Sequence, residues 1–259
     1  MSSPFPTRAL RGLAGAAVLF ALLEAVTRAH IVDPTYLPPA SSVLATTATL
    51  LTDPGFLAQV GATLAAWAVG LLSAVAIGVP LGILLGSSAR WYAASITAIE
   101  FVRPVPSVAL IPLAILLLGQ DLDMKAALVA FASLWPVLFN TIYGMHEVDP
   151  VARDTARAFG YGRLAVARMV ALPSAAPFIY TGIRVAAAFA LILAVATELI
   201  AGGSLGLGAW MARMSETGVD RRFLYAGIVV TGLLGLVINA AMVAAERRLF
   251  GWHHRVRAA

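Results

Sequence analysis

The feature that most constrains the fold is the stretch from Pro54 to Ala89, which contains no charged residue. A helix needs only about 20 apolar residues to cross the hydrocarbon core of a bilayer. A second uncharged run covers Ala126–Met145. Residues are 60% hydrophobic and only 12% charged, whereas soluble domains are nearer a quarter charged. Because a backbone in lipid must satisfy its own hydrogen bonds, these runs predict transmembrane helices.

The 259 residues suit one all-α, polytopic membrane protein with about six transmembrane helices. We predict an N-terminal helix and interfacial segment over 1–56, a transmembrane core over 57–250 and a basic tail over 251–259. The predicted spans are Ala9–Thr27, Leu57–Gly86, Trp91–Leu118, Ala126–Met145, Ala175–Ala201 and Phe223–Ala245. Glycines of the second span, several of them four apart, permit close helix approach.

Three segments depart from simple spans. Arg8 and Arg11 precede the apolar run Gly12–Leu23, and this pattern resembles a secretory signal. No clear cleavage site follows, so a retained first helix is preferred. The piece Ser41–Leu51 is predicted as a short surface helix with Ser41 or Ser42 as its N-cap. The third span is interrupted at Arg103-Pro104-Val105-Pro106.

Basic residues set the orientation in the membrane. Alternating six spans places eleven arginines on one side and five basic residues on the other. The first side is therefore cytoplasmic, with both termini and the charged stretch Asp149–Pro177 inside. Arg28, Lys125, Arg213, Arg221 and Arg222 are assigned to the outer side.

Several chemistries are excluded or disfavoured. There is no cysteine, so thiolate catalysis and cysteine metal sites are impossible. The chain has one lysine, Lys125, and no phosphate-binding loop, so it does not hydrolyse ATP alone. The segment GGSLGLG is interpreted as a flexible connection. His253 and His254 are interpreted as part of a solvated tail rather than a metal site, and nucleic-acid binding explains the basic residues poorly.

The stretch Asp149–Pro177 is the most charged of the chain. Its spacing predicts one short helix whose Ala156 and Phe159 face something apolar. Gly160 ends this helix, and a second helix over Arg163–Ala171 stops before Pro173. An ordinary solvated connection is the alternative, but the stretch is longer than most helix connections.

These residues resemble the signature of the membrane subunits of bacterial ABC importers. The signature is Glu-Ala-Ala, three residues, Gly, nine residues, Ile, one residue and Leu-Pro. Here it reads Asp154, Thr155 and Ala156, then Gly160, Val170, Leu172 and Pro173, with every spacing kept and Thr155 as the real departure. The segments FVRPVPSVALIPLAILLLG, LFNTIYGMHEVDP and VATELIAGGSLGLG resemble the subgroup for sulfonates, taurine, nitrate and similar small solutes.

The resemblance covers about Tyr36–Leu249 and implies a type I ABC importer permease fold in the bacterial inner membrane. It implies a second copy of this permease, two ATP-binding cassette subunits that bind ATP and Mg, and a periplasmic or lipid-anchored solute-binding protein. The coupling loop would be 147–173. The residues expected to couple to the ATPase are Asp154, Thr155, Ala156, Phe159, Gly160, Val170, Leu172 and Pro173.

Ionisable residues within spans are costly and are candidates for the solute pathway. Arg103, Pro104, Pro106 and Glu198 are the predicted pathway residues. Glu100 and Arg103 could instead pair with each other, and Glu198 could be an interfacial charge. Arg184 could extend its charge to the cytoplasmic surface. Asn239 is expected to hydrogen-bond another helix.

Three functions are compared. The first is a permease subunit that imports solute by alternating access, driven by a separate ATPase. The second is a proton-coupled secondary transporter that uses Glu100 or Glu198. The third is a membrane enzyme, which would need a cluster of catalytic groups that the sequence does not offer. The signature around Gly160 favours the first.

Overall fold

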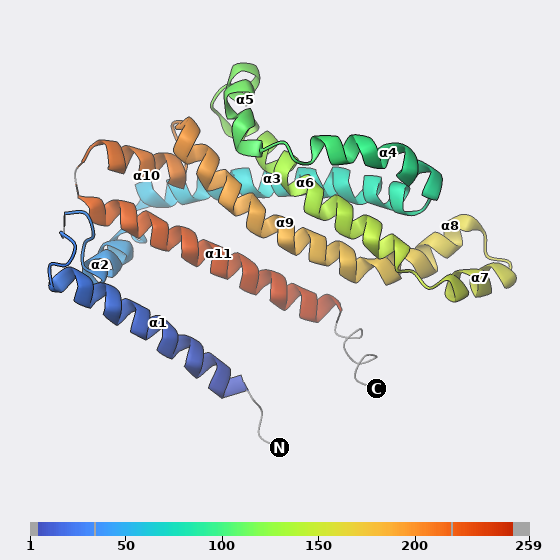
Figure 1. Cartoon of the computed structure of the whole chain (residues 1–259), viewed down its shortest axis with the longest axis horizontal. Helices are drawn as coiled ribbons and strands as arrows, with labels where there is room; N and C mark the ends of the chain where they lie inside the picture. Colours follow the sequence, from blue (N-terminus) through green and yellow to red (C-terminus); the bar gives the residue numbers. More distant parts are fainter. Residues whose placement is uncertain (1–4, 34, 219, 251–259) are drawn as a thin grey trace.

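The computed structural model describes residues 5–33, 35–218 and 220–250, and in these ranges every regular element is a helix (Figure 1). The all-α prediction is confirmed. The elements are α1 (Phe5–Arg28), α2 (Ala40–Leu50), α3 (Pro54–Gly86), α4 (Ala89–Val102), η1 (Ser107–Leu110), α5 (Ile111–Leu118), α6 (Leu122–His146), α7 (Pro150–Ala158), α8 (Arg163–Val166), η2 (Ala167–Ala171), α9 (Leu172–Ala201), α10 (Leu207–Glu216) and α11 (Arg221–Leu249).

Within the described ranges, four helices are long and apolar enough to cross a membrane: α3, α6, α11 and the continuous helix Arg163–Ala201. The pair α4 and α5 makes a fifth span if it is counted together, and it is bent by 73° at the predicted proline break. The predicted first span forms a helix, α1, and its crossing of the bilayer stays a prediction.

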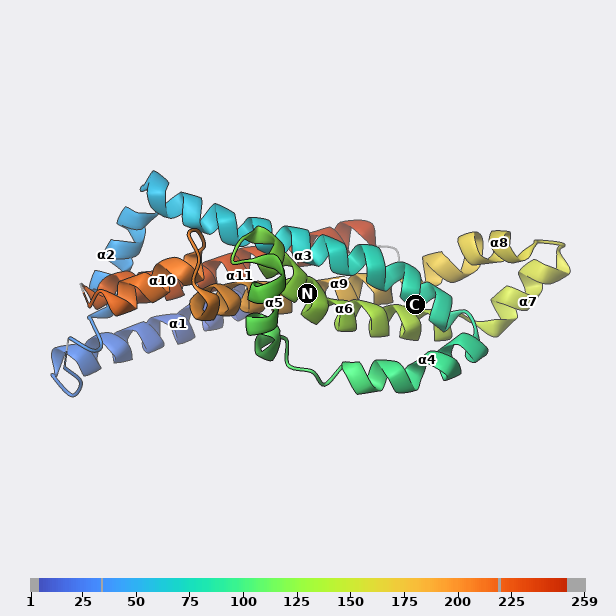
Figure 2. The ribbon, with the colours of Figure 1, turned by 90° about the horizontal axis from the view of Figure 1, so that it is seen from above.

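The core is a layer of α3, α6 and α9, which lie side by side in both views (Figures 1 and 2). The sequence predicted that glycines of α3 permit close helix approach, and in the structure they lie against α6. A Cβ added at Gly82 would lie 2.5 Å from the Thr141 Cβ, and one added at Gly70 would lie 2.5 Å from the Val129 Cγ1. Glycine therefore occupies the positions where the two helix backbones come close together.

The second predicted helix of the charged stretch does not stop before Pro173. It continues through the π-helical turn η2 into α9, so that Arg163–Ala201 is one helix. Pro173 lacks a backbone N–H and would clash with the carbonyl four residues earlier in a regular α-helix. A wider turn immediately before the proline takes up this mismatch, which the sequence interpretation did not allow for.

The N-terminal segment also differs from expectation at one cap. The N-cap of α2 is Pro39, and no side chain caps this end. Ser41 instead donates its hydroxyl and backbone N–H to the Glu24 carboxylate, at 2.8 and 2.9 Å, and so joins α2 to α1. At the start of α3, Asp53 accepts hydrogen bonds from two backbone N–H groups and acts as a regular N-cap.

Candidate functional site

The α7–α8 hairpin, residues 149–171, extends past the end of α6 and α9 (Figures 1 and 2). Asp149 caps α7 by accepting a hydrogen bond from the Val151 N–H at 2.9 Å. Gly160 ends α7 with a φ of +84°, in the left-handed region that favours glycine. The predicted helix and its stop are confirmed, and the turn sends the chain back toward the core.

The hairpin has an anchored side and an exposed side. Val170 packs on a cluster of buried residues, Met145, Val148, Ala171 and Ala175, at its base. Phe159 is 79% exposed, and Val151 and Leu164 are also exposed. The apolar surface that Phe159 was expected to face is therefore not supplied by the described part of this chain. Large apolar side chains gathered on a protruding element are typical of an interaction surface.

The coupling residues predicted from the signature divide between these two sides. Asp154, Thr155, Phe159 and Gly160 are exposed, Ala156 is half-buried, and Val170 and Leu172 are half-buried at the base, where Pro173 is exposed. Their role in coupling stays a prediction. Their arrangement is that of a fixed stem carrying an exposed tip.

The inner side of the hairpin is basic. Arg153, Arg157 and Arg163 line a cavity of about 510 Å³ together with Ser87 and Ser88 from the α3–α4 turn. Arg153 donates a hydrogen bond to the Met145 carbonyl at 2.6 Å, which fixes α7 to the end of α6. Arg157 pairs with Asp154 at 3.3 Å, but both side chains are exposed, so this pair adds little stability.

At the other end of the core, Glu198 is fully buried. Its carboxylate accepts hydrogen bonds from the Thr63 hydroxyl at 2.8 Å and the Gly208 N–H at 3.0 Å, and it pairs with Lys125 at 3.4 Å. The alternative of an interfacial charge is wrong. A role in the solute pathway stays a prediction, and in this conformation the carboxylate is occupied by partners from α3, α6 and α10.

The glycine-rich segment is a packed element rather than a flexible connection. A Cβ added at Gly206 would lie 2.4 Å from the Glu198 carboxylate, and one at Gly208 would lie 2.3 Å from the Val195 carbonyl. Gly206 also has a φ of +135°. Lys125 donates to the Leu205 carbonyl in the same loop. The loop is thus wrapped around the buried ion pair.

The sequence interpretation missed the partners of Glu198. Lys125 was assigned only to the outer side of the membrane, and the structure shows that it is buried, at 5% exposed. Thr63 lies 135 positions away along the chain, so no local pattern could connect it with Glu198. One signal was present: the only lysine of the chain stands directly before the uncharged run of α6.

The proline break lies at an exposed bend. Arg103, Pro104 and Pro106 are exposed, and the break separates α4 from η1 and α5. The suggested pairing of Arg103 with Glu100 is wrong in this conformation. The guanidinium of Arg103 instead lies over the Phe139 ring of α6, 4.7 Å from its centroid. Whether this bend faces the solute pathway stays a prediction.

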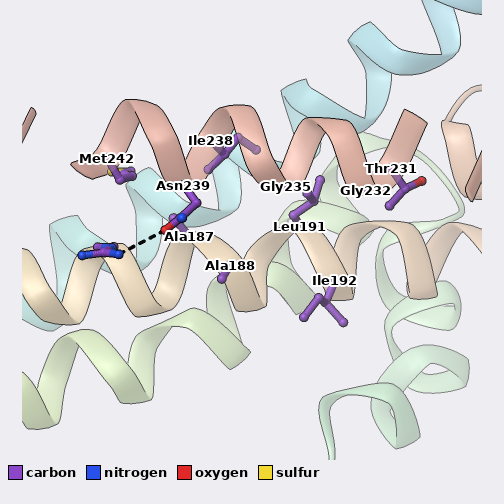
Figure 3. A pocket seen from close by; sticks show the side chains of 11 residues that line it. Ala187, Ala188, Leu191, Ile192, Thr231, Gly232, Gly235, Ile238, Asn239 and Met242 are labelled. Carbon is purple, nitrogen blue, oxygen red and sulfur yellow. Dashed lines mark hydrogen bonds between the residues drawn. The ribbon is translucent and has the colours of Figure 1, made fainter. Parts of the chain in front are cut away.

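Arg184 pairs within the protein. Its Nη1 lies 3.0 Å from the Glu246 Oε2, and its Nη2 donates to the Asn239 Oδ1 at 3.3 Å. The expected hydrogen bond between Asn239 and another helix is confirmed, with Asn239 as the acceptor, and Figure 3 marks it with a dashed line. Arg184 and Asn239 both line a cavity between α9 and α11.

Long apolar helices and a broken span define a polytopic membrane protein, and a basic hairpin protrudes from it. The chain matches the family "Binding-protein-dependent transport system inner membrane component" over residues 78–251, and it belongs to this family. Its fold is similar to that of a chain of the MetNI methionine ABC transporter in an inward-facing form. The TM-score is 0.60 at 21% identity, over 73% of this chain and 94% of that one.

Curated relatives narrow the class. The chain is 31% identical to the taurine transport system permease protein TauC of Escherichia coli, over 93% of this chain and 89% of that protein. It is 30% identical to the nitrate import permease protein NrtB of Leptolyngbya laminosa, over 73% and 67%. It is 28% identical to the putative aliphatic sulfonates permease SsuC of Bacillus subtilis, over 95% and 88%. This chain is an ABC importer permease of the inner membrane.

Proposed function

We propose that this permease imports a small anionic solute with energy from a separate ATPase that docks on the α7–α8 hairpin. The observation that carries the proposal is the exposed apolar tip of this hairpin, where Phe159 is largely exposed. Proteins rarely leave such side chains on a protruding element unless a partner covers them. The arginines beside the tip would complement acidic groups on that partner.

The continuous helix Arg163–Ala201 supports a mechanical link between the ATPase and the membrane core. At about 1.5 Å per residue it joins the hairpin to the Glu198 cluster at the far end. Closure of the ATPase pair would push the hairpin, and α9 would transmit the push to the helices packed on it. The core would then open alternately to the outside and the inside.

The remaining components follow from the same scheme. The complex would contain a second copy of this permease, two ATPase subunits that hold ATP and Mg, and a solute-binding protein on the outer face. Both termini would be cytoplasmic, because basic residues gather on that side. The solute class is proposed from the relatives, whose names give taurine, nitrate and aliphatic sulfonates, all of which carry an anionic group.

The test is a reconstituted complex of permease, ATPase and binding protein in proteoliposomes. The change Phe159→Ala should lower ATP-driven uptake at least tenfold by weakening ATPase docking, with unchanged thermal stability. The matched control is Leu72→Ala, which truncates an exposed side chain of the membrane core. Equal uptake by the two variants, or uptake without any ATPase, would contradict the proposal.

No observation favours the proton-coupled alternative. A coupling carboxylate must exchange protons with both sides of the membrane, whereas Glu198 is enclosed by Lys125, Thr63 and the 202–206 loop. Uptake that persists after ATP depletion and collapses with the proton gradient would instead restore that alternative.

A further inference from the structure

The cavity of about 510 Å³ between the α7–α8 hairpin and the α3–α4 turn, the basic cavity, has one strongly polar side. This side is lined by three arginines and two serines: Arg153, Arg157, Arg163, Ser87 and Ser88. Among the described residues, no carboxylate belongs to the lining. Three like charges along one cavity repel one another and favour the entry of an anion.

The hydrogen-bond donors of the basic cavity are only partly used. Arg163 is exposed, and within the described part of the chain it forms no ion pair. Arg153 gives one hydrogen bond to the Met145 carbonyl, which leaves other N–H groups of its guanidinium. Ser88 is the N-cap of α4, but its side chain makes no capping bond. The positive end of the α4 dipole at this serine adds to the attraction for an anion.

The position of the basic cavity indicates the source of the anion. Both α3 and the α4–α5 pair are apolar enough to cross a membrane, so the turn that joins them lies at a membrane surface. Ser87 and Ser88 belong to this turn, at the end of the uncharged stretch Pro54–Ala89. Apolar side chains, among them Val166 and Ala171, form the rest of the lining. A soluble anion would leave these apolar side chains uncovered, whereas a lipid covers both kinds of surface.

We propose that the basic cavity binds the phosphate of an anionic phospholipid from the adjacent leaflet. The phosphate would accept hydrogen bonds from Arg153, Arg163 and the Ser88 hydroxyl, and the glycerol backbone would lie on the apolar lining. Arginine suits this role because its planar guanidinium presents two parallel N–H groups to a phosphate. The donors come from the hairpin and from the α3–α4 turn, so the lipid would hold the two together. This inference goes beyond the proposed function, in which the exposed tip meets the ATPase.

The test uses the full complex of permease and ATPase in nanodiscs of phosphatidylcholine and phosphatidylglycerol, followed by native mass spectrometry. The wild type should retain phosphatidylglycerol in preference to phosphatidylcholine, because the choline cation would meet the arginines. Arg163→Gln should lower this retention about fivefold, the loss expected for one arginine near an anionic membrane surface. Arg168→Gln is the matched control, since it removes the same charge from the same helix but does not line the cavity.

A second variant changes the size of the cavity and leaves its charge unaltered. Ala167 lines the basic cavity, so Ala167→Leu places a larger side chain inside it. It should lower the retention of phosphatidylglycerol at least fivefold while all three arginines remain. Thermal stability is measured for every variant, and that of Arg163→Gln should equal that of Arg168→Gln, since Arg163 has no ion-pair partner to lose within the described chain.

Three outcomes would overturn the inference. Equal retention of phosphatidylglycerol by Arg163→Gln and Arg168→Gln would place the lipid elsewhere. Displacement of the lipid by inorganic phosphate, but not by chloride at the same ionic strength, would identify a soluble phosphate as the occupant. Retention by the permease alone but not by the full complex would mean that acidic groups of the ATPase fill the cavity.

Discussion

Glu198 of α9 and Lys125 of α6 form a buried ion pair, against which Gly206 and Gly208 pack closely. Each charge is also hydrogen-bonded: Thr63 and the Gly208 N–H donate to the carboxylate, and the ammonium donates to a carbonyl. Such pairs add little net stability when compared with apolar residues, but removal of one partner leaves a buried charge. The pair therefore fixes the geometry of the loop.

Lys125→Met should destabilise the protein by about 3–5 kcal/mol, since it leaves the Glu198 carboxylate buried and unpaired. Thermal unfolding in detergent would measure the loss. The double variant Lys125→Met/Glu198→Gln removes both charges and should be less destabilised than Lys125→Met alone. Additive losses would show that the two residues do not interact.

Asp220 caps α11, and its hydrogen bonds predict that the stability of the fold depends on pH. The side chain and backbone N–H of Arg222 both donate to its carboxylate, and they hold the pKa of Asp220 below its ordinary value. Because the pKa is lower in the folded state than in the unfolded state, the ionised Asp220 stabilises the fold fully when the pH lies above the ordinary pKa. This stabilisation is lost as the pH falls through the lowered pKa of the folded state. The Tm difference between wild type and Asp220→Asn should therefore shrink between pH 6 and pH 3. A constant difference would contradict the capping role.

At the residue scale, the sequence identified Glu198, Arg184 and Asn239 because polar side chains inside apolar runs are conspicuous. It did not identify their partners, because Thr63 and Lys125 reach Glu198 from distant parts of the chain. A charge near the end of a span also looks the same in sequence whether it faces lipid headgroups or the interior. Only the packing of the 202–206 loop distinguishes the two.

Glycines of α3 allow its close contact with α6. Gly82→Leu should prevent it, because even a Cβ at this position would lie 2.5 Å from the Thr141 Cβ and 3.0 Å from the Leu138 carbonyl. Overpacking of this kind costs about 1–3 kcal/mol, and more where backbone must move. Folded yield and thermal stability in detergent are the measurements. Gly61→Leu should behave as wild type, and equal losses in both would contradict the argument.

The α7–α8 hairpin depends on the left-handed turn at Gly160. Gly160→Val should lower ATP-driven uptake, since a β-branched residue in this conformation costs at least about 1–2 kcal/mol and would shift the turn. Gly160→Asn should keep most of the activity, because asparagine tolerates a positive φ. A Cβ at this glycine meets nothing within 4 Å, so steric exclusion does not explain a difference. Equal uptake by both variants would remove the turn from the coupling mechanism.

At the element scale, helices were predictable where long uncharged runs coincide with spans, as for α3, α6 and α11. The break at Pro104 and Pro106 was predictable too, since proline lacks an N–H. Pro173 misled the same reasoning, because a π-helical turn can precede a proline and keep the helix continuous. The glycine-rich loop misled it for another reason: glycine serves flexibility and close packing alike.

For the whole molecule, Figure 1 places the α3–α4 turn and the α7–α8 hairpin at one end and the α1–α2 and α10–α11 connections at the other. The arginine count predicts that the first end is cytoplasmic. A C-terminal green fluorescent protein fusion should fluoresce, and a C-terminal alkaline phosphatase fusion should be inactive. The opposite pattern would reverse the orientation in the membrane and place the hairpin on the outer side, where no ATPase can reach it.

The unbroken course of Arg163–Ala201 has a consequence for how this chain tolerates insertions and deletions. Each residue added to an α-helix turns everything beyond it by about 100°. A single deletion near Ala176 would rotate the hairpin, and Phe159 with it, about the axis of this helix without unfolding any element. An insertion of about seven residues into the wild-type helix, close to two whole turns, should keep the hairpin in its original orientation about the helix axis.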